Sequence, residues 1–345
     1  MVGDQKVITK GIAKNNALKN RYGKPKAQKF CKLKELDSVG EVTEKKLKEH
    51  GIGLIRHLAI TPISFLTDVV GLGEISARKI VKNAQKRENI NFKRSSEIWD
   101  LKKNLYKLTT GSEELDDLLG GGVESGKVSE FFGENNTGKT QIAHQLCVNV
   151  QLPYEEGGLE GNALYIDSEG TYSPERIIQI AVEKGLDHNE VLQNIIVGSA
   201  YNSDHQILLV REAPTIIQEY NIKLVVVDSL ISHFRSEYTE KSTTLACQNL
   251  IYGHIADMKR ISNIFPNVIM FFTNQISIKP DVFFGNPIVA AGGKIVAHGS
   301  TIRVFLRKGK GEQRIAKLIQ APHLPEGEGY FIINQEGICD LEKWS

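Results

Sequence analysis

The stretch that decides the fold reads FFGENNTGKTQ, residues 131–141. It contains the phosphate-loop pattern G-x-x-x-x-G-K-[ST] in full, between a short apolar run and a segment with helical spacing of apolar residues. In this setting the backbone N–H groups at the start of a helix can surround the phosphates of a nucleotide. We therefore predict a nucleoside triphosphate site formed by the loop residues Gly133, Glu134, Asn135, Asn136, Thr137, Gly138, Lys139, Thr140 and Gln141.

Four side chains carry the chemistry expected at such a site. Lys139 would bind the β- and γ-phosphates, and the Thr140 hydroxyl would hold Mg²⁺. Asp228 ends the apolar run LVVVD, where a carboxylate can hold the shell of the Mg²⁺, usually through water. Glu169 follows the run ALYID and could act as general base toward the attacking water. The alternatives are that Asp228 caps a turn and that Glu169 is a surface acid, while Asp167 is expected to be structural.

Residues 108–345 have the pattern of an α/β domain. Near-continuous apolar runs alternate with helical stretches at 128–132, 163–166, 194–197, 224–227 and 268–273. Such runs indicate strands that are buried on both faces, as in a parallel sheet. Two later runs, at 301–306 and 315–319, flank RKGKGEQR and predict an antiparallel hairpin. The fold class is therefore α/β, a phosphate-loop core with a twisted, mostly parallel sheet.

Composition adds a smaller domain and a tail to this core. The chain has 345 residues, 41% hydrophobic and 24% charged, enough for one large domain and one small one. Its first 29 residues carry eight Lys or Arg against one acid, so we expect residues 1–30 to be a disordered basic tail. A transit peptide is less favoured, because the segment lacks Ser and is rich in Lys rather than Arg.

No apolar run approaches the length of a membrane span. Cys147 lies on an apolar stripe of helical spacing, with Ile142, Leu146 and Val150, and is predicted to be core.

Residues 31–90 contain two similar passages, LDSVGEVTEKKLKEHGI and VVGLGEISARKIVKNAQ. Each predicts a turn at glycine followed by a helix that a Thr or Ser caps, which together make a small all-α helix-hairpin-helix domain. Backbone N–H groups at Gly71 and Gly73 could bind a DNA phosphate without reading sequence. The alternative is a protein-interaction module whose glycines only turn the chain.

The order of motifs along the chain resembles that of the RecA-like strand-exchange recombinases. The motifs are TTGSEELDDLLGGGVESGKVSEFFGENNTGKTQ, YIDSEGTYSPERI, YNSDHQ, VVVDSLISHFR, TNQ and APHLPEGE. The resemblance extends from about residue 36 to 338 and is strongest to archaeal RadA, with the eukaryotic recombinases next. It implies a RecA-like ATPase core at 108–345. It also implies an ATP-bound helical filament on single-stranded DNA that pairs with homologous duplex and exchanges strands.

The resemblance assigns further nucleotide contacts. Gln275 in TNQ would sense the γ-phosphate, and Arg176 in SPERI would pack over the adenine. His298 would reach the ATP of a neighbouring subunit, and Gln320 stands where the family commonly has an aspartate near that ATP. The alternatives are that Gln275 is a buried core glutamine and that Arg176 is a surface arginine in a salt bridge. For His298 the alternative is a core histidine whose hydrogen bonds are satisfied.

Two loops would contact DNA by the same resemblance, at about 235–248 and 277–293. Arg235, Lys241 and Lys279 would supply charge for phosphates. In the first loop Lys241 lies where the family usually has Gly-Arg-Gly, and Cys247 replaces a second arginine. We therefore expect weaker DNA binding than in a typical member. The alternative is that these are ordinary mobile surface loops.

The segment 91–107 is predicted to be a linker with the polymerisation motif. In the family this motif is Phe-x-x-Ala, which inserts into the neighbouring core. Here the motif begins at Phe92, and Ser95 replaces the alanine. A buried hydroxyl without a partner costs about 1–3 kcal/mol, so self-association could be weakened.

The sequence therefore predicts a DNA-dependent ATPase of homologous recombination and DNA repair. It would use ATP and Mg²⁺. Its partners would be single-stranded and double-stranded DNA, further copies of itself in a filament or ring, and recombination mediators, with no membrane. The expected location is the cytoplasm of an archaeal cell, at the nucleoid. The main alternative is a divergent paralogue that joins filaments as a regulatory or structural subunit, and a ring helicase is less favoured.

Overall fold

The computed structural model describes residues 31–238, 244–278 and 288–341. The described chain divides into two compact units, a smaller one that ends at Asn104 and a larger one that begins at Leu105. The basic tail predicted for residues 1–30 lies outside the described residues. No helix in the described ranges is long and apolar enough to cross a membrane.

The smaller unit is helical. Its elements are η1 (Leu33–Glu35), α2 (Glu41–Glu49), α3 (Ile55–Ala59), α4 (Ile63–Asp68), α5 (Glu74–Arg87) and α6 (Ser95–Lys102). The longest helix, α5, buries Ala77, Ile80 and Ala84, which lie three or four residues apart on one face. They belong to one hydrophobic cluster with Leu47 and Leu58. This unit therefore has a core of its own.

The predicted caps of two helices in this unit are wrong. Gly40 is the N-cap of α2 and Gly73 is the N-cap of α5, both in extended conformation. The expected Thr and Ser caps lie inside the first turn. Glu41 and Glu74 come first in their helices, where a negative charge interacts favourably with the helix dipole. In addition, α6 lies within the segment predicted to be a linker.

A nine-stranded sheet forms the centre of the larger unit. Its order is β13-β12-β11-β10-β3-β7-β6-β4-β5. The strands from β10 to β5 in this order are parallel, and β11, β12 and β13 add antiparallel at one side. The bounds are β3 (Val128–Gly133), β4 (Asn162–Asp167), β5 (Ile195–Ser199), β6 (Ile222–Asp228), β7 (Ile269–Asn274), β10 (Ile302–Lys308), β11 (Gln313–Gln320), β12 (Gly327–Asn334) and β13 (Gly337–Cys339). The predicted α/β class, the late hairpin and the parallel strands are confirmed, but burial on both faces is wrong for β5, which lies at the sheet edge and has alternating exposure.

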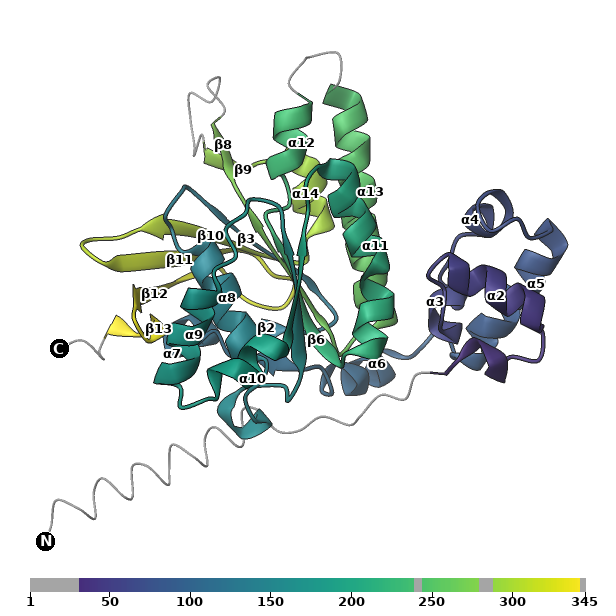
Figure 1. The fold of residues 1–345 in the computed structure, drawn as a ribbon, viewed down its shortest axis with the longest axis horizontal. Helices are drawn as coiled ribbons and strands as arrows, with labels where there is room; N and C mark the ends of the chain where they lie inside the picture. The colour runs from purple at the N-terminus through teal and green to yellow at the C-terminus, as the bar shows by residue number, and fades with distance from the viewer. Residues whose placement is uncertain (1–30, 239–243, 279–287, 342–345) are drawn as a thin grey trace, which may run out of the picture. The chain divides into compact units, whose positions relative to one another are not determined.

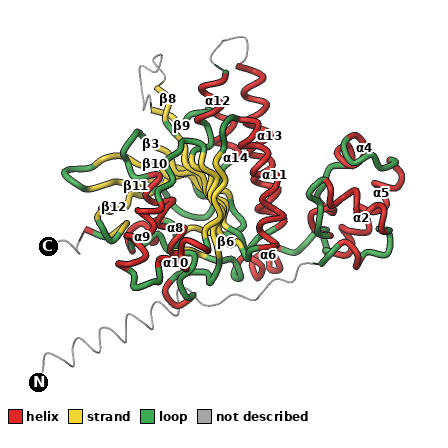
Figure 2. The backbone as a smooth tube through the Cα atoms, in the orientation of Figure 1, coloured by secondary structure: helices red, strands yellow, loops and turns green. Residues whose placement is uncertain are grey.

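Helices cover both faces of this sheet (Figures 1 and 2). One face carries α8 (Lys139–Asn149), α9 (Pro174–Glu183) and α10 (His188–Gln193). The opposite face carries α11 (Ser203–Glu219) and α13 (Thr244–Ile264). The shorter elements are α7 (Glu113–Leu118), η2 (Tyr154–Glu156), α12 (Ser232–Glu237), α14 (Gly293–Gly299) and the strand pair β1 (Lys107–Leu108) and β2 (Val123–Glu124).

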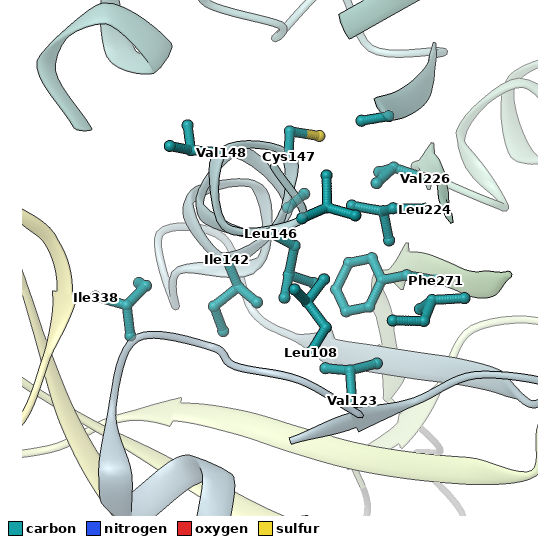
Figure 3. Packing of buried hydrophobic residues seen from close by; sticks show 14 of the residues in the cluster. Leu108, Val123, Ile142, Leu146, Cys147, Val148, Leu224, Val226, Phe271 and Ile338 are labelled. Atoms are coloured by element: carbon teal, nitrogen blue, oxygen red, sulfur yellow. The ribbon is translucent and has the colours of Figure 1, made fainter. Parts of the chain in front are cut away.

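The core of the larger unit lies between α8 and the sheet. Figure 3 shows Ile142, Leu146 and Cys147 of α8 close to Leu224 and Phe271 of the strands. All five side chains are fully buried, so the prediction that Cys147 is core is confirmed. Burial raises the pKa of the Cys147 thiol, which keeps it neutral. This packing fixes the start of α8 relative to the strand ends, and the phosphate loop joins the two.

The described flanks of the two expected DNA loops are more regular than the sequence predicted. Arg235 lies in α12, and α13 already begins at Thr244, so both flanks of the first loop are helical. The buried Ile251, Ile255 and Met258 repeat at helical spacing, which explains the long α13. At the second loop, β8 (Ile276–Ile278) pairs antiparallel with β9 (Ile288–Ala290).

Candidate functional site

The phosphate loop connects β3 to α8 and depends on two glycines. A Cβ atom on Gly133 would lie 2.3 Å from the carbonyl oxygen of Leu306. Gly138, the N-cap of α8, has φ +101°, and its Cβ would lie 2.7 Å from Ile333 Cδ1. Both positions therefore require glycine, as the motif predicts. Asn136 has φ +62°, which asparagine tolerates better than most residues.

Lys139 lies across the mouth of this loop. Its Nζ donates to the carbonyl oxygens of Gly133, at 3.0 Å, and Glu134, at 2.7 Å. Burial lowers the pKa of Lys139, and the charges of Asp228 and Glu169 oppose that shift. The Lys139 side chain therefore runs along the phosphate loop. It lies at the end of the sheet where the carboxylates of Asp228 and Glu169 also lie.

Asp228 is the last residue of β6 and is buried. Its carboxylate accepts hydrogen bonds from Tyr165 Oη, at 2.6 Å, and from Thr273 Oγ1. Burial raises the pKa of Asp228, while hydrogen bonds from Thr273, Tyr165 and Thr140 act in the opposite direction. The contact between Thr140 and Asp228 brings together the two oxygen ligands predicted for Mg²⁺.

These oxygens fit a magnesium ion held jointly with phosphates. In the described part of the chain, no three His, Cys, Asp or Glu side chains gather into a group that could hold a metal. Mg²⁺ is commonly bound by one or two protein oxygens together with waters and substrate phosphates. The pair of Thr140 and Asp228 matches that donor set.

Glu169 lies just beyond β4, in a loop that Asp167 organises. The Asp167 carboxylate accepts four backbone N–H groups, those of the consecutive residues from Glu169 to Tyr172, at 2.9–3.2 Å. This agrees with the structural role expected for Asp167. Glu169 Oε1 accepts from Ser229 Oγ at 2.6 Å and from Gln275 Nε2 at 2.9 Å. Glu169 is therefore exposed but held in place by two hydrogen bonds, and its role as general base stays a prediction.

Gln275 follows β7 and connects two sides of the site. Its Nε2 donates to Glu169, and its Oε1 accepts from Arg235 at 3.0 Å. The residue is only half-buried, which argues against the alternative of a glutamine enclosed in the core. Its carbonyl oxygen accepts the N–H of Ala291, just after β9. Gln275 thus contacts Glu169 and the flanks of both expected DNA loops.

A buried ion pair beside Gln275 was not found by sequence reasoning. Glu130 of β3 is fully buried and pairs with Arg303 of β10 at 2.5 Å. Its other oxygen accepts from Asn274 Nδ2 at 2.7 Å, and Asn274 also donates to Ala291. Charged residues inside the apolar runs VSEFFG and IRVFL were the available signal. The network ties the residue before Gln275 to the centre of the sheet.

Arg176 lies in α9 beside a cavity of about 840 Å³. Its guanidinium donates to Gln141 Oε1 at 2.7 Å and to the carbonyl oxygens of Asn334 and Gln335. Within the described residues it forms no ion pair with a carboxylate, so the alternative of a salt-bridge arginine is wrong. Burial lowers the pKa of Arg176. Ile333, which contacts Gly138, also lines the cavity, so the cavity adjoins the phosphate loop.

His298 and Gln320 lie outside this cluster. His298 is exposed on α14, which contradicts the alternative of a core histidine. Gln320 ends β11, and its Nε2 donates to the carbonyl oxygen of Ser300 at 3.1 Å. Exposure suits the expected contacts with a neighbouring subunit, which stay predictions.

The expected DNA and assembly residues are divided between described and undescribed parts. Lys241 and Lys279 lie outside the described residues. Gly71, with φ +72°, and Gly73 precede α5, and a Cβ on either would meet nothing within 4 Å. The backbone at these glycines is therefore open. Phe92 and Ser95 of the smaller unit are exposed, and Ser95 begins α6.

The comparison with known families agrees with this geometry. A family model described as Rad51 matches residues 101–341. The match includes the phosphate loop, Glu169, Asp228, Gln275 and the whole nine-stranded sheet.

Proposed function

The chain belongs to the Rad51 family of RecA-like recombinases, and from this premise we propose that it is a DNA-dependent ATPase. It forms filaments on single-stranded DNA with ATP and Mg²⁺, pairs them with homologous duplex and exchanges strands. The observation that carries the proposal is the convergence of Lys139, Asp228, Glu169 and Gln275 at one end of the sheet. A subunit with a purely structural role would not need this complete set.

The residues divide the work of hydrolysis. Lys139 binds the β- and γ-phosphates, and Arg176 supplies a flat cation for the adenine. Thr140 and Asp228 would hold Mg²⁺, which neutralises phosphate charge. Glu169 accepts a proton from water while the water oxygen bonds to the γ-phosphorus and the bond to the β-phosphate oxygen breaks. The products are ADP and phosphate, and Gln275 responds to the loss of the γ-phosphate.

ATP hydrolysis with and without single-stranded DNA tests this proposal. We expect the wild-type rate of ATP hydrolysis to rise on addition of poly(dT). With DNA present, Lys139→Ala should hydrolyse ATP at least about 10²-fold more slowly than the wild type, because the change removes transition-state charge stabilisation. Lys127→Ala is a matched control, since Lys127 lies at the opposite end of β3 and is partly exposed. A wild-type rate that does not respond to DNA, or that Lys139→Ala leaves unchanged, would contradict the proposal.

A further inference from the structure

Asp228 is held from both sides by hydroxyl groups of the neighbouring strands. Its strand, β6, lies between β4 and β7 in the sheet. From β4, Tyr165 Oη donates to Asp228 Oδ2 at 2.6 Å. From β7, Thr273 Oγ1 donates to Asp228 Oδ1. Each carboxylate oxygen therefore has its own donor, and the side chain cannot rotate without losing one of these two hydrogen bonds.

The register of the three strands explains why one donor is long and the other is short. Val226 pairs with Tyr165 of β4 and with Phe271 of β7. Side chains two residues apart lie on the same face of a strand, so Asp228 lies one such step beyond Val226. Thr273 lies the same step beyond Phe271, and its short side chain reaches the carboxylate of Asp228. Tyr165 begins one step earlier, and its long phenol side chain covers the difference.

The Tyr165 ring is itself fixed by two other rings. It stacks on His144 of α8, with 5.6 Å between ring centroids and 11° between ring planes. Its centroid lies 5.0 Å from that of Tyr172, and His144 and Tyr172 also contact each other, at 5.6 Å. His144 Nε2 accepts the backbone N–H of Ser173. Tyr165 is fully buried among these groups, so its phenol oxygen has one defined position.

The carboxylate of Asp228 keeps acceptor capacity on the side of the phosphate loop. An ionised carboxylate offers about four acceptor sites, and the hydroxyls of Tyr165 and Thr273 occupy two of them. Thr140, the other predicted oxygen ligand, hydrogen-bonds to the same carboxylate from the first turn of α8. The two strand hydroxyls therefore fix the carboxylate and leave acceptor sites for the water shell of Mg²⁺.

We propose that Tyr165 and Thr273 are positioning residues that orient Asp228 toward the Mg²⁺ of the bound nucleotide. Partners that orient a metal ligand typically change metal affinity by about 10- to 100-fold when they are removed. The sequence alone does not single out either residue, because Tyr165 stands inside the apolar run ALYID and Thr273 inside the buried strand β7. The inference rests on the proposed function in one respect, that Asp228 serves a nucleotide-bound Mg²⁺.

The test is the Mg²⁺ dependence of nucleotide binding by the full chain. The probe is mant-AMPPNP, a fluorescent ATP analogue that resists hydrolysis, so the measurement does not depend on catalysis. Its fluorescence is followed as MgCl₂ is added, which gives the Mg²⁺ concentration at half-saturation. In Tyr165→Phe, which keeps the ring and removes the hydroxyl, this concentration should rise about tenfold. At saturating Mg²⁺ the binding of mant-AMPPNP should reach the wild-type level.

Matched variants separate the hydroxyls from the side chains that carry them. Thr273→Val removes the second hydroxyl at nearly constant shape and should also raise the half-saturating Mg²⁺ concentration about tenfold. Thr273→Ser keeps a donor and should leave that concentration unchanged. Tyr172→Phe is the control for Tyr165→Phe, because it removes a phenol hydroxyl from the same group of rings. In the described chain the Tyr172 hydroxyl is not among the donors to Asp228, so this control should match the wild type.

Two results would overturn the inference. If Tyr165→Phe and Thr273→Val, shown to be folded by circular dichroism, keep the wild-type half-saturation, the hydroxyls only satisfy a buried carboxylate. If both variants weaken binding equally at every Mg²⁺ concentration, they support the nucleotide and not the metal ligand. Should Tyr165→Phe fail to fold, the comparison of Thr273→Val with Thr273→Ser decides. A wild type that binds mant-AMPPNP with Mg²⁺ but shows no DNA-stimulated hydrolysis would contradict the proposed function and leave this inference intact.

Discussion

At the scale of single residues, the site is built from buried polar groups whose partners determine their charge. Asp228 lies beneath the phosphate loop with Tyr165 and Thr273 as hydrogen-bond donors. His144, on the inner side of α8, accepts the backbone N–H of Ser173 through Nε2 and stacks on Tyr165. Burial keeps this imidazole neutral, lowering its pKa from 6.5 to about 4, with the charge of Arg176 acting in the same direction.

His144 therefore makes the stability of the protein depend on pH. Its folded-state pKa lies below the unfolded value, so the unfolded chain binds a proton first as the pH falls from 6.5 toward 4. We expect His144 to lower the free energy of unfolding by about 2 kcal/mol between pH 7 and pH 5. Urea unfolding at both pH values measures this difference, with His144→Asn as the comparison. An equal pH dependence in both proteins would contradict the assignment.

At the scale of elements, the sequence predicts what local chemistry decides. The glycines, Lys139 and the strand ahead of them are required by the phosphate cradle itself, so the motif locates them. Continuous apolar runs likewise identify strands that are buried on both faces. The strands β12 and β13 were not predicted, because β12 begins with Gly-Glu-Gly and has only a short apolar run, and β13 has three residues at the sheet edge.

Contacts between distant elements were not predictable from the sequence. Glu130 and Arg303 lie far apart in the chain and meet only because β3 and β10 are neighbours in the sheet. The bond of Arg235 to Gln275 likewise depends on α12 and β7 ending close together. The helical flanks of the first loop were missed because Phe234 is buried by tertiary packing, which local spacing does not reveal.

The loop that follows β4 provides a prediction at this scale. Asp167 accepts backbone N–H groups along the loop that carries Glu169, and its replacement would leave them without that partner. We expect Asp167→Ala to lower the free energy of unfolding by about 2–4 kcal/mol and to reduce the ATP hydrolysis rate more than the affinity for ATP. Thermal unfolding and steady-state kinetics measure the two effects. Glu175→Ala, an exposed acid at the start of α9, is the control. A stable Asp167→Ala variant with a normal rate would contradict this role of the carboxylate.

At the scale of the whole molecule, the proposed filament requires that copies of the chain attach to one another. Phe92 is fully exposed and Ser95 begins a helix, so both are available for contact with another copy. We predict that Phe92→Ala abolishes assembly on single-stranded DNA with ATP. Ser95→Ala should strengthen assembly by about 1–3 kcal/mol, because in the proposed filament the Ser95 hydroxyl would be buried in an apolar pocket of the neighbouring copy. Sedimentation velocity gives both results, and Trp99→Ala, another exposed aromatic of this unit, is the control. Normal assembly of Phe92→Ala would place the contact elsewhere.

The central claim is that ATP binding at this phosphate loop supports exchange of DNA strands. The most direct measurement is the formation of joint molecules from single-stranded DNA and homologous duplex by the purified full chain. The account predicts joint molecules with ATP and Mg²⁺ in the wild type and in Lys127→Ala, and none in Lys139→Ala. Filaments that assemble on DNA with ATP but yield no joint molecules would contradict the claim and favour a structural or regulatory subunit.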